Sequence, residues 1–465
     1  MRKPALLSIL PVALLLGGCT AMKMERPRET ARIDTPALWL EAGRGSNGRI
    51  STGWLDEFND RRMKQLVLEA VRDNNDLRAA AHRLRAVKEG TIGARAARLP
   101  SVRTGAGYSQ SRSGDGPGPD AIRESYSASL SASWEADLWG RLRDLDAASR
   151  ADYQSALADF RAARLSLAVN TAKAWITLIT AEQQLDLGER TLISYKNNLS
   201  IIERKYKANQ LRAVDVQFGR NNVAAAERNV RNRTLERNEA ARSLELFLGH
   251  YPAAKIQGAM DLPTMKQDVP VGLPSDLLSR RPDLAASQAA VYVSAKRADA
   301  ARKDLLPSLR LTGSAANSSD AFRRAIDPAY LTWAAASSLA QTVYSGGAPT
   351  ADARAALDRN KAAIDSYVQD CLVAFREVES ALETERSLAE QEIFLRKEVA
   401  QAGLAETQSE RDFAKGIEGS TVLEILEAQR RAANSRGSLI QLRGRRLRNR
   451  LDLHLALGGD FETPK

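Results

Sequence analysis

Few side chains in this sequence have the type and spacing that catalysis needs. The three histidines, His82, His250 and His454, are far apart, and none has an acidic residue or cysteine at metal-ligand spacing. No glycine-rich phosphate loop follows an expected strand, and no serine–histidine–acid set is visible. We therefore expect a protein that is not an enzyme and that holds no metal or other cofactor, apart from a covalent lipid.

Cys19 is the residue whose surroundings predict a covalent modification. Residues 1–18 have the pattern of a secretory signal peptide: two basic residues, an apolar run and then small residues. Leu16-Gly17-Gly18-Cys19 resembles the bacterial lipobox, in which cleavage leaves the cysteine at the new N-terminus for acylation, for example by palmitate. An ordinary signal peptide with an incidental cysteine is the alternative. We favour the lipoprotein because Cys371, the other cysteine, lies in an expected helix and is predicted to be buried.

Three acidic residues, Asp215, Glu424 and Glu427, could act through their charge. Asp215 and Glu424 correspond in an internal repeat, and Glu427 follows one helical turn later. In a cyclic oligomer each becomes a ring of carboxylates, which draws cations and repels anions. Such crowding would also raise the pKa of each carboxyl. The alternative is that these are solvated residues on a highly charged helix surface.

A tandem duplication supplies the elements that position these residues. Several short motifs recur 207 residues later: Asp76-Leu77 as Asp283-Leu284, Leu99-Pro100-Ser101 as Leu306-Pro307-Ser308, and Gly140 as Gly347. From Asp215 and Glu424 onward the offset is 209, so two residues are inserted near 417–423. The chain is therefore a tandem duplication, and the duplication determines its architecture.

The repeats divide the chain into six segments. These are a signal peptide (1–18), a lipid-anchored tether (19–60), the first repeat (61–250), a linker (251–272), the second repeat (273–458) and a tail (459–465). Each repeat is expected to contain a helix, a β-hairpin, a long helix and a return helix, in that order.

Alternation of apolar and polar residues predicts the hairpins. From Tyr126 to Leu138, thirteen residues alternate between apolar and polar without a break, which fits a tilted strand that spans a bilayer in about 9–11 residues. Segments 101–113, 308–319 and 329–344 complete two hairpins. Trp134 and Trp139 lie near one end, where an aromatic girdle is expected. The edge of a soluble sheet would show the same alternation.

The helical segments are unusually long. Residues 61–99, 141–208 and about 36 residues ending at Leu248 favour helix, and repeat two follows with helices ending at 306, 415 and 457. At about 1.5 Å per residue, 141–208 would extend on the order of 100 Å. No globular core needs helices of that length, so a helical tunnel or a coiled coil is indicated.

Composition agrees with long helices and excludes one class of partner. Aromatic residues make up 5% of the chain and charged residues 27%. The net charge is +11, but the basic residues are interleaved with acidic ones along the chain. We see no basic block or aromatic platform that would mark a nucleic-acid site, and expect none.

Four strands per chain cannot stand alone in a membrane. Unpaired backbone groups at an open sheet edge cost several kcal/mol each in a bilayer. Single-chain barrels begin at about eight strands. If these strands cross a membrane, the chain must assemble around a cyclic axis, and three copies would give twelve strands.

The chain resembles the TolC-like outer-membrane factors, specifically the lipoprotein branch that serves multidrug efflux. The resemblance covers Trp54 to Gly458 and rests on three motifs: Gly272–Leu278 continued by Arg281–Leu284, Glu135–Arg141, and Glu427-Ala428-Gln429-Arg430. The chain departs from the family pattern at Asp60-Arg61, where Asp-Pro is usual, and this leaves the capping of the first helix open.

The resemblance implies an α+β membrane protein. Its fold would be a trimeric twelve-stranded outer-membrane β-barrel continuous with a periplasmic α-helical barrel, lipid-anchored in the outer membrane. It also implies a homotrimer that engages a periplasmic adaptor and an inner-membrane pump, often of the resistance-nodulation-division type, to export drugs or other small molecules. Two alternatives remain open: a channel for type I protein secretion, and a non-conducting periplasmic lipoprotein spacer.

The resemblance also implies two functional regions. The helix reversals at Asn209 and Gly416 would form the adaptor-docking tip, with these surface residues: Leu211, Ala213, Val214, Ile417, Ser420 and Val422. The family has acidic residues near the tip that narrow the closed pore. Glu427 is our first candidate for that gate and Asp215 the second, with Glu424 as the repeat partner of Asp215.

Overall fold

The computed structural model describes residues 24–33, 35–40, 53–113, 121–265, 272, 274–417 and 419–461. They form two compact units, and each unit draws on both repeats. The first contains residues 83–157 and 286–369 with the described residues before 34, and the second contains the rest. The sequence repeats are therefore not separate compact bodies.

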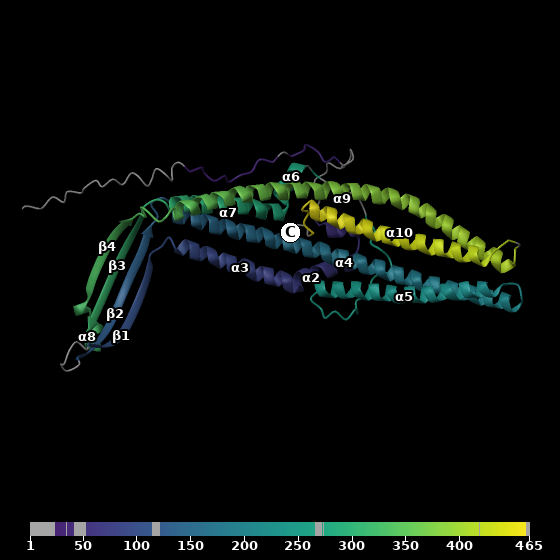
Figure 1. Ribbon diagram of the computed structural model, residues 1–465, viewed down its shortest axis with the longest axis horizontal. Helices are drawn as coiled ribbons and strands as arrows, with labels where there is room; N and C mark the ends of the chain where they lie inside the picture. The colour runs from purple at the N-terminus through teal and green to yellow at the C-terminus, as the bar shows by residue number, and fades with distance from the viewer. Residues whose placement is uncertain are drawn as a thin grey trace, which may run out of the picture. The chain divides into compact units, whose positions relative to one another are not determined.

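The first unit contains a four-stranded antiparallel sheet (Figure 1). Its strands follow the chain order: β1 (Ser101–Ser113), β2 (Ala121–Ala136), β3 (Ser308–Ser319) and β4 (Thr332–Ala340). Both predicted hairpins are confirmed. β4 is shorter than the predicted 329–344, because Pro328–Tyr330 forms a 3-10 turn capped by Asp327.

The register of the sheet gives it two different faces. Leu130 of β2 lies opposite Ala315, while the next residue, Ser131, lies opposite Arg103 and Ser314. Directly opposed residues share a face, as do residues two apart on a strand. One face therefore carries Tyr126, Leu130 and Trp134 and is mainly apolar, while the other carries serine and arginine. This is the alternation that a strand between lipid and water requires.

The two tryptophans near the strand ends make specific bonds. The Trp134 indole N–H donates to the Arg98 carbonyl at 2.9 Å, and the Trp139 indole N–H donates to the Pro307 carbonyl at 2.8 Å. The first bond joins β2 to the segment just before β1, and the second joins the segment just after β2 to the residue before β3. Their membership of an aromatic girdle stays a prediction.

Eight helices carry most of the chain in the described ranges. They are α2 (Arg61–Asp73), α3 (Asn75–Ala96), α4 (Arg141–Lys207), α5 (Ala213–Phe247), α6 (Pro274–Arg280), α7 (Pro282–Lys303), α9 (Ala348–Lys415) and α10 (Val422–Ala456), with one short turn, α8 (Phe322–Ala325). α4 passes Gly188 without a break. None of these helices is both long and apolar enough to cross a bilayer.

The predicted opening helices, 61–99 and its counterpart ending at 306, are each broken once. The first break is at Asn74, whose Oδ1 accepts the Leu77 N–H and whose Nδ2 donates to the Phe247 carbonyl, both at 3.0 Å. The second is at Arg281, whose Nη1 donates to the Ala456 carbonyl at 3.2 Å. The single-helix prediction was wrong for two reasons. At the first joint the Asn74 side chain replaces a backbone acceptor, and at the second a new helix begins at Pro282, which has no N–H to continue the preceding one.

The main core lies in the second unit. Trp54 and Phe58, in a 3-10 turn (η1, Trp54–Phe58), are fully buried with side chains of α2, α4 and α5. Asp60 caps α2 by accepting the Met63 N–H at 3.0 Å, and its other oxygen accepts the Trp175 indole N–H at 2.8 Å. The open question of capping is thus resolved by Asp60 itself. The predicted tether of 19–60 was too long, because residues 54–60 belong to this core.

The described part of the tether lies on α9. In the first unit, the Arg28 N–H donates to Asn360 Oδ1 at 2.8 Å and the Arg28 carbonyl accepts from Asn360 Nδ2 at 2.9 Å. In the second unit, Trp39 packs edge-on against Phe375 with ring centres 6.0 Å apart. Cys371, on the same helix, is fully buried, as predicted.

Candidate functional site

The two helix reversals share one backbone design. Asn209, between α4 and α5, has φ 58°, and Gly416, between α9 and α10, has φ 71°. The Gln210 N–H donates to the Lys205 carbonyl at 2.9 Å, and the Ile417 N–H donates to the carbonyl of Asp412 at 3.1 Å. Both are six-residue closures that use a left-handed residue, and asparagine tolerates this conformation as the sequence predicted.

Two of the three candidate gate acids cap the return helices. An Asp215 oxygen accepts the Arg212 N–H at 3.0 Å at the start of α5. A Glu424 oxygen accepts the Thr421 N–H at 3.0 Å at the start of α10, and the Thr421 hydroxyl accepts the Glu424 N–H at 3.2 Å. Asp215 is 6% exposed, whereas Glu424 is exposed. These carboxylates therefore stabilise the helix starts whatever else they do.

A small apolar cluster supports the reversals from inside. It contains Ile202, Val216, Phe413, Val422, Ile425 and Leu426, with Leu211 packed at its side. Val422 is only 2% exposed, so its predicted place on the docking surface was wrong. It is the first residue of α10, and its side chain turns to the face that packs on the cluster.

The other predicted tip residues lie at or near the surface. Asn209, Ala213 and Gly416 are exposed, Ser420 is half-buried, and Val214 and Ile417 are 41% and 49% exposed. Three apolar side chains near them were missed: Tyr206, Phe218 and Leu423 are also exposed. Leu423 was detectable from the sequence as an apolar residue in the first turn of the return helix, next to the candidate gate acid Glu424. We call the exposed apolar side chains at the two reversals the tip surface: Tyr206, Val214, Phe218, Ile417 and Leu423.

Glu424 and Glu427 line one hollow between α9 and α10. It has a volume of about 620 Å³, and Asp412 and Arg431 also line it. Three carboxylates against one guanidinium make this hollow acidic. The structure thus brings together two of the three candidate gate acids, while Asp215 lies on the other reversal.

Glu427 is held by two arginines of its own helix. Its Oε1 accepts from Arg431 Nε at 2.7 Å and from Arg430 Nη2 at 2.8 Å, and its Oε2 accepts from Arg430 Nε at 2.8 Å. These bonds, Arg431 first, lower the pKa of the Glu427 carboxyl. A rise in this pKa was expected from crowding in a carboxylate ring. Within one chain the arginines act in the opposite direction and keep the group ionised.

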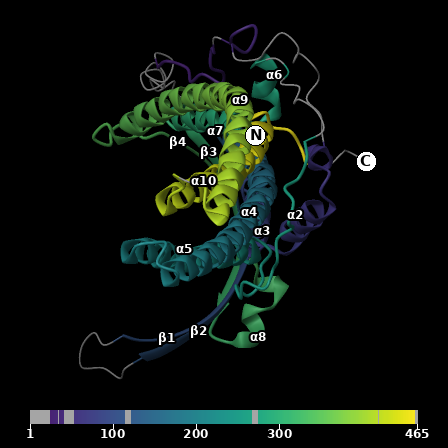
Figure 2. The same cartoon turned by 90° about the vertical axis from the view of Figure 1, so that its right-hand side faces the viewer.

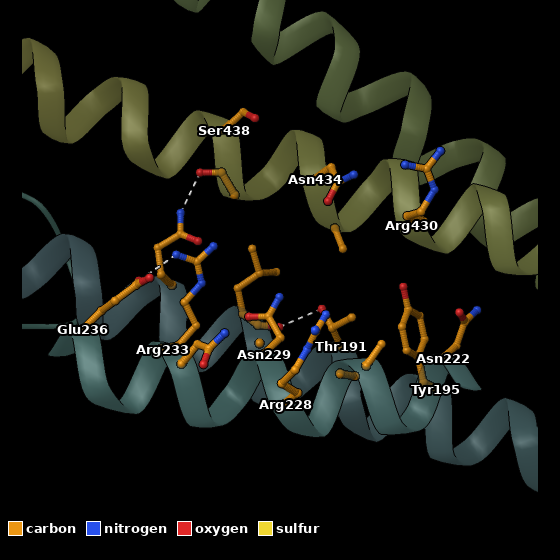
Figure 3. A pocket seen from close by; sticks show the side chains of 18 of the residues that line it. Thr191, Tyr195, Asn222, Arg228, Asn229, Arg233, Glu236, Arg430, Asn434 and Ser438 are labelled. Carbon is orange, nitrogen blue, oxygen red and sulfur yellow. Dashed lines mark hydrogen bonds and ion pairs between the residues drawn. The ribbon is translucent and has the colours of Figure 1, made fainter. Parts of the chain in front are cut away.

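A second hollow lies where α4, α5 and α10 face one another (Figure 3). Its volume is about 720 Å³. Carboxamides such as Asn222, Asn229 and Asn434 line it, and an Arg233–Glu236 ion pair of 2.8 Å lies at its wall. Gly188 and Gly437, which have no side chain, also line it. The sequence signal was a stripe of small and amide residues at helical spacing, which was not recognised.

One predicted site residue, Cys19, lies outside the described residues. Among the described residues, no three histidine, cysteine, aspartate or glutamate side chains converge as a metal site. His454 is fully buried instead, stacked on Trp54 with ring centres 5.6 Å apart.

Comparison with known proteins gives the same result by sequence and by structure. The chain is 27% identical to the cation efflux system protein CusC of Escherichia coli O6:H1, over 97% of this chain and 98% of that protein. It is 26% identical to the probable outer membrane lipoprotein SilC of Salmonella typhimurium, covering 99% of this chain and all of SilC. The open-state MtrE outer membrane channel of Neisseria gonorrhoeae superposes with a TM-score of 0.81 at 25% identity, over 95% of this chain and 99% of MtrE.

The family match covers both halves of the chain separately. The sequence pattern of the Outer membrane efflux protein family matches residues 66–250 and again residues 273–459. The two matches confirm the tandem duplication, and they span both reversals and all four strands. This chain belongs to the outer membrane efflux protein family.

Proposed function

We propose that three copies of this chain form the outer-membrane exit channel of a tripartite efflux assembly. In this proposal a periplasmic adaptor and an inner-membrane pump of the resistance-nodulation-division type complete the assembly. The pump supplies the energy, and the channel supplies a path and a gate for drugs or other small molecules.

The observation that carries the proposal is the sheet with two open edges. β1 and β4 each pair with one neighbour in the described chain, so each presents an unpaired edge. A bilayer does not tolerate such edges, because each unsatisfied backbone group costs several kcal/mol there. Joining β4 of one copy to β1 of the next satisfies both edges, and three copies close a ring of twelve strands. The serine and arginine face then lines a water-filled interior.

The tip surface supports the adaptor as a partner. Val214, Ile417 and Leu423 expose apolar area at the two reversals, where a helix hairpin has no packing need for it. The hollow is lined by residues of three helices, α4, α5 and α10 (Figure 3), which suits a further helix from a partner.

The gate is proposed to lie at the acidic hollow of α10. Threefold symmetry would repeat Glu424 and Glu427 as carboxylate rings, which favour cations. Arg430 and Arg431 keep Glu427 ionised, so its ring would retain charge in mildly acidic solution. Asp215 would add a further ring from the first repeat.

Acylation of Cys19 is proposed as a second membrane attachment. The lipobox resemblance supports it, and so does the relative whose name describes a probable outer membrane lipoprotein. One acyl chain gives only marginal membrane binding by itself, so the barrel would remain the main anchor. Intact mass of the mature protein, with Cys19→Ala as control, tests the modification.

Cross-linking tests the proposed ring directly. One cysteine is introduced on β1 and one on β4, at several registers, in a Cys371→Ala background. Oxidation should link separate chains into covalent dimers and trimers. As the matched control, Ser131→Cys with Ser314→Cys joins directly opposed residues of β2 and β3, so its link stays within one chain.

Conductance then separates a channel from a spacer. Purified trimers in planar bilayers should conduct ions, and the gene should restore drug resistance to a strain that lacks its own channel. Monomers in every β1–β4 pair would contradict the ring. Closed trimers that never conduct, even after substitution of Glu424 and Glu427, would favour the periplasmic spacer.

A further inference from the structure

An arginine-rich segment of α10 has no part in the proposed channel function. Five arginines lie in the eight residues from 443 to 450: Arg443, Arg445, Arg446, Arg448 and Arg450. A helix turns by about 100° per residue. Positions 443, 446 and 450 therefore share one face, and positions 445 and 448 lie on the opposite face.

The arginines that face α9 are neutralised by carboxylates. Arg443 Nε donates to Glu392 Oε1 at 3.1 Å, and Arg446 Nη1 donates to Glu392 Oε2 at 3.0 Å. Arg446 Nε also donates to Glu385 at 3.1 Å. This face of α10 thus forms ordinary interhelical ion pairs.

Arg445 and Arg448 have no such partners. In the described part of the chain neither makes an ion pair, and Arg448 Nη1 donates only to the Thr177 hydroxyl of α4, at 3.3 Å. The nearby acid, Asp452, accepts from Lys173 of α4 at 2.6 Å and is therefore already engaged. The group of Lys173, Arg445, Arg448 and Asp452 carries a net charge of +2.

The environment makes this arrangement unfavourable as it stands. Arg448 is half-buried beside Arg445, which is exposed. Burial, and then repulsion from Arg445, lower the pKa of the Arg448 guanidinium, and Asp452 only partly opposes this. An anion between the two guanidinium groups would relieve both effects.

We propose that Arg445 and Arg448, with Thr177 and Lys173, form an oxyanion-binding site on the α4–α10 surface. Guanidinium groups match the planar geometry of carboxylates and the oxygens of phosphates, so the ligand class is a molecule with a phosphate or closely spaced carboxylates. The Thr177 hydroxyl, which donates to the Lys173 carbonyl at 2.8 Å, accepts from Arg448 and so holds that guanidinium in place. Lys173, one helical turn earlier on α4, adds positive charge. We call this group the arginine site.

Calorimetric titration of the full-length trimer in detergent tests the arginine site. Citrate and inorganic phosphate are titrated separately at low ionic strength, where exposed charges are least screened. One saturable site per chain is expected, and the stronger of the two probes assigns the ligand to carboxylate or phosphate chemistry. The neutral triethyl ester of citrate should not bind.

Three variants make the test specific. The double variant Arg445→Met with Arg448→Met should raise Kd by about tenfold or more, since hydrogen bonds to charged groups are lost. Arg448→Lys keeps the positive charge but loses the planar guanidinium group that can form two parallel hydrogen bonds, and should also weaken binding. Arg443→Met removes one guanidinium from the opposite face, where Arg396 and Arg446 still hold Glu392, and should leave Kd unchanged.

Circular dichroism and trimer mass show whether each variant is folded. If the double variant does not fold, Arg445→Met alone and Arg448→Lys provide the comparison. The proposal is overturned if the wild-type trimer shows no saturable binding. It is also overturned if Arg443→Met weakens binding as much as the double variant, or if a carboxylate of the neighbouring subunit occupies Arg445 and Arg448 in a trimer structure.

Discussion

α4 and α10 pack tightly at Gly444, and its replacement gives a sharp test of how the two helices pack. A methyl carbon at Gly444 would overlap the Thr180 hydroxyl and would lie 3.3 Å from the Thr180 methyl. Thr180 cannot give way easily, because its hydroxyl donates to the Ile176 carbonyl at 2.7 Å in a buried position. Gly444→Ala must therefore push α10 away from α4.

The magnitude follows from two opposing contributions. Overpacking of a close-packed interior costs about 1–3 kcal/mol. The same substitution gains about 0.8–1 kcal/mol of helix propensity, because alanine replaces glycine within a helix. The net expectation is a loss of up to about 2 kcal/mol per chain. Gly403→Ala in α9 is the matched control, since its added methyl meets no atom closer than 3.5 Å and should only stabilise.

Thr180→Ala supplies the second arm of a double-mutant cycle. It removes the two atoms that clash and leaves Thr180 Cβ, 3.4 Å from the added methyl, which is ordinary contact. The single change Thr180→Ala should cost about 1 kcal/mol for the lost buried methyl. The double variant should be more stable than the sum of the singles predicts, by about 1 kcal/mol or more.

Apparent Tm of detergent-solubilised trimers at one fixed scan rate measures these effects. The expected order is Gly403→Ala at or above wild type, and Gly444→Ala below it, with partial recovery when Thr180→Ala is added. Additive effects of Gly444→Ala and Thr180→Ala would refute the close approach of α4 and α10 at this position.

Three further substitutions test individual side chains. Glu424→Gln keeps the hydrogen bond that caps Thr421 and Glu424→Ala loses it, so only the alanine variant should lose about 1 kcal/mol of stability. Both variants should lower the cation selectivity of the channel if the gate lies at Glu424. Burial raises the pKa of Glu392, but bonds from three arginines outweigh it and lower the pKa below 4.5. Its contribution to stability is present above pH 4.5 and is lost as pH falls through the lowered value, so thermal unfolding of Glu392→Gln should depend less on pH in that range. Asn209→Gly should be neutral or slightly stabilising, and Asn209→Val should cost about 1–2 kcal/mol because of its left-handed backbone.

The elements whose pattern is repeated could be predicted from the sequence. Segment 308–319 was predicted to the residue, and the long helices end within a few residues of their predicted limits. Periodicity and the offset of 207 carry that information. The left-handed reversal at Asn209 was also predictable, because few residue types adopt positive φ and asparagine is among them.

Properties that depend on which face of a helix is covered were not predictable. Val422 looked like a surface residue because it follows a turn, yet α10 directs it inward. The arginines of 443–450 read as interleaved surface charge, and only the packing of α9 on one face and α4 on the other separates the paired from the unpaired groups. Linear sequence does not say which helix lies on which side.

The joints at Asn74 and Arg281 lie at equivalent positions of the two repeats. They lie 207 residues apart, and the carbonyls they bind, Phe247 and Ala456, lie 209 apart, which are the two offsets of the repeat. A neutral amide makes the bond in the first repeat and a guanidinium in the second. Duplication has thus preserved the position of the joint and the acceptor it reaches near the end of the return helix, while the donor has changed its chemistry. The two return helices, α5 and α10, are seen in Figures 1 and 2.

That pattern follows from what a joint requires. The return helix ends at the same place in each repeat, so its last carbonyls need an outside donor there. Any side chain that reaches the carbonyl can supply it, and the residue type is free to change as long as a donor remains. Comparison of residue types between the repeats could not reveal the helix break, because Asn74 and Arg281 differ in type. The offset of 207 nevertheless relates the two positions. Asn74→Ala should therefore loosen the joint, and an arginine at that position should restore it more fully than a leucine of similar bulk.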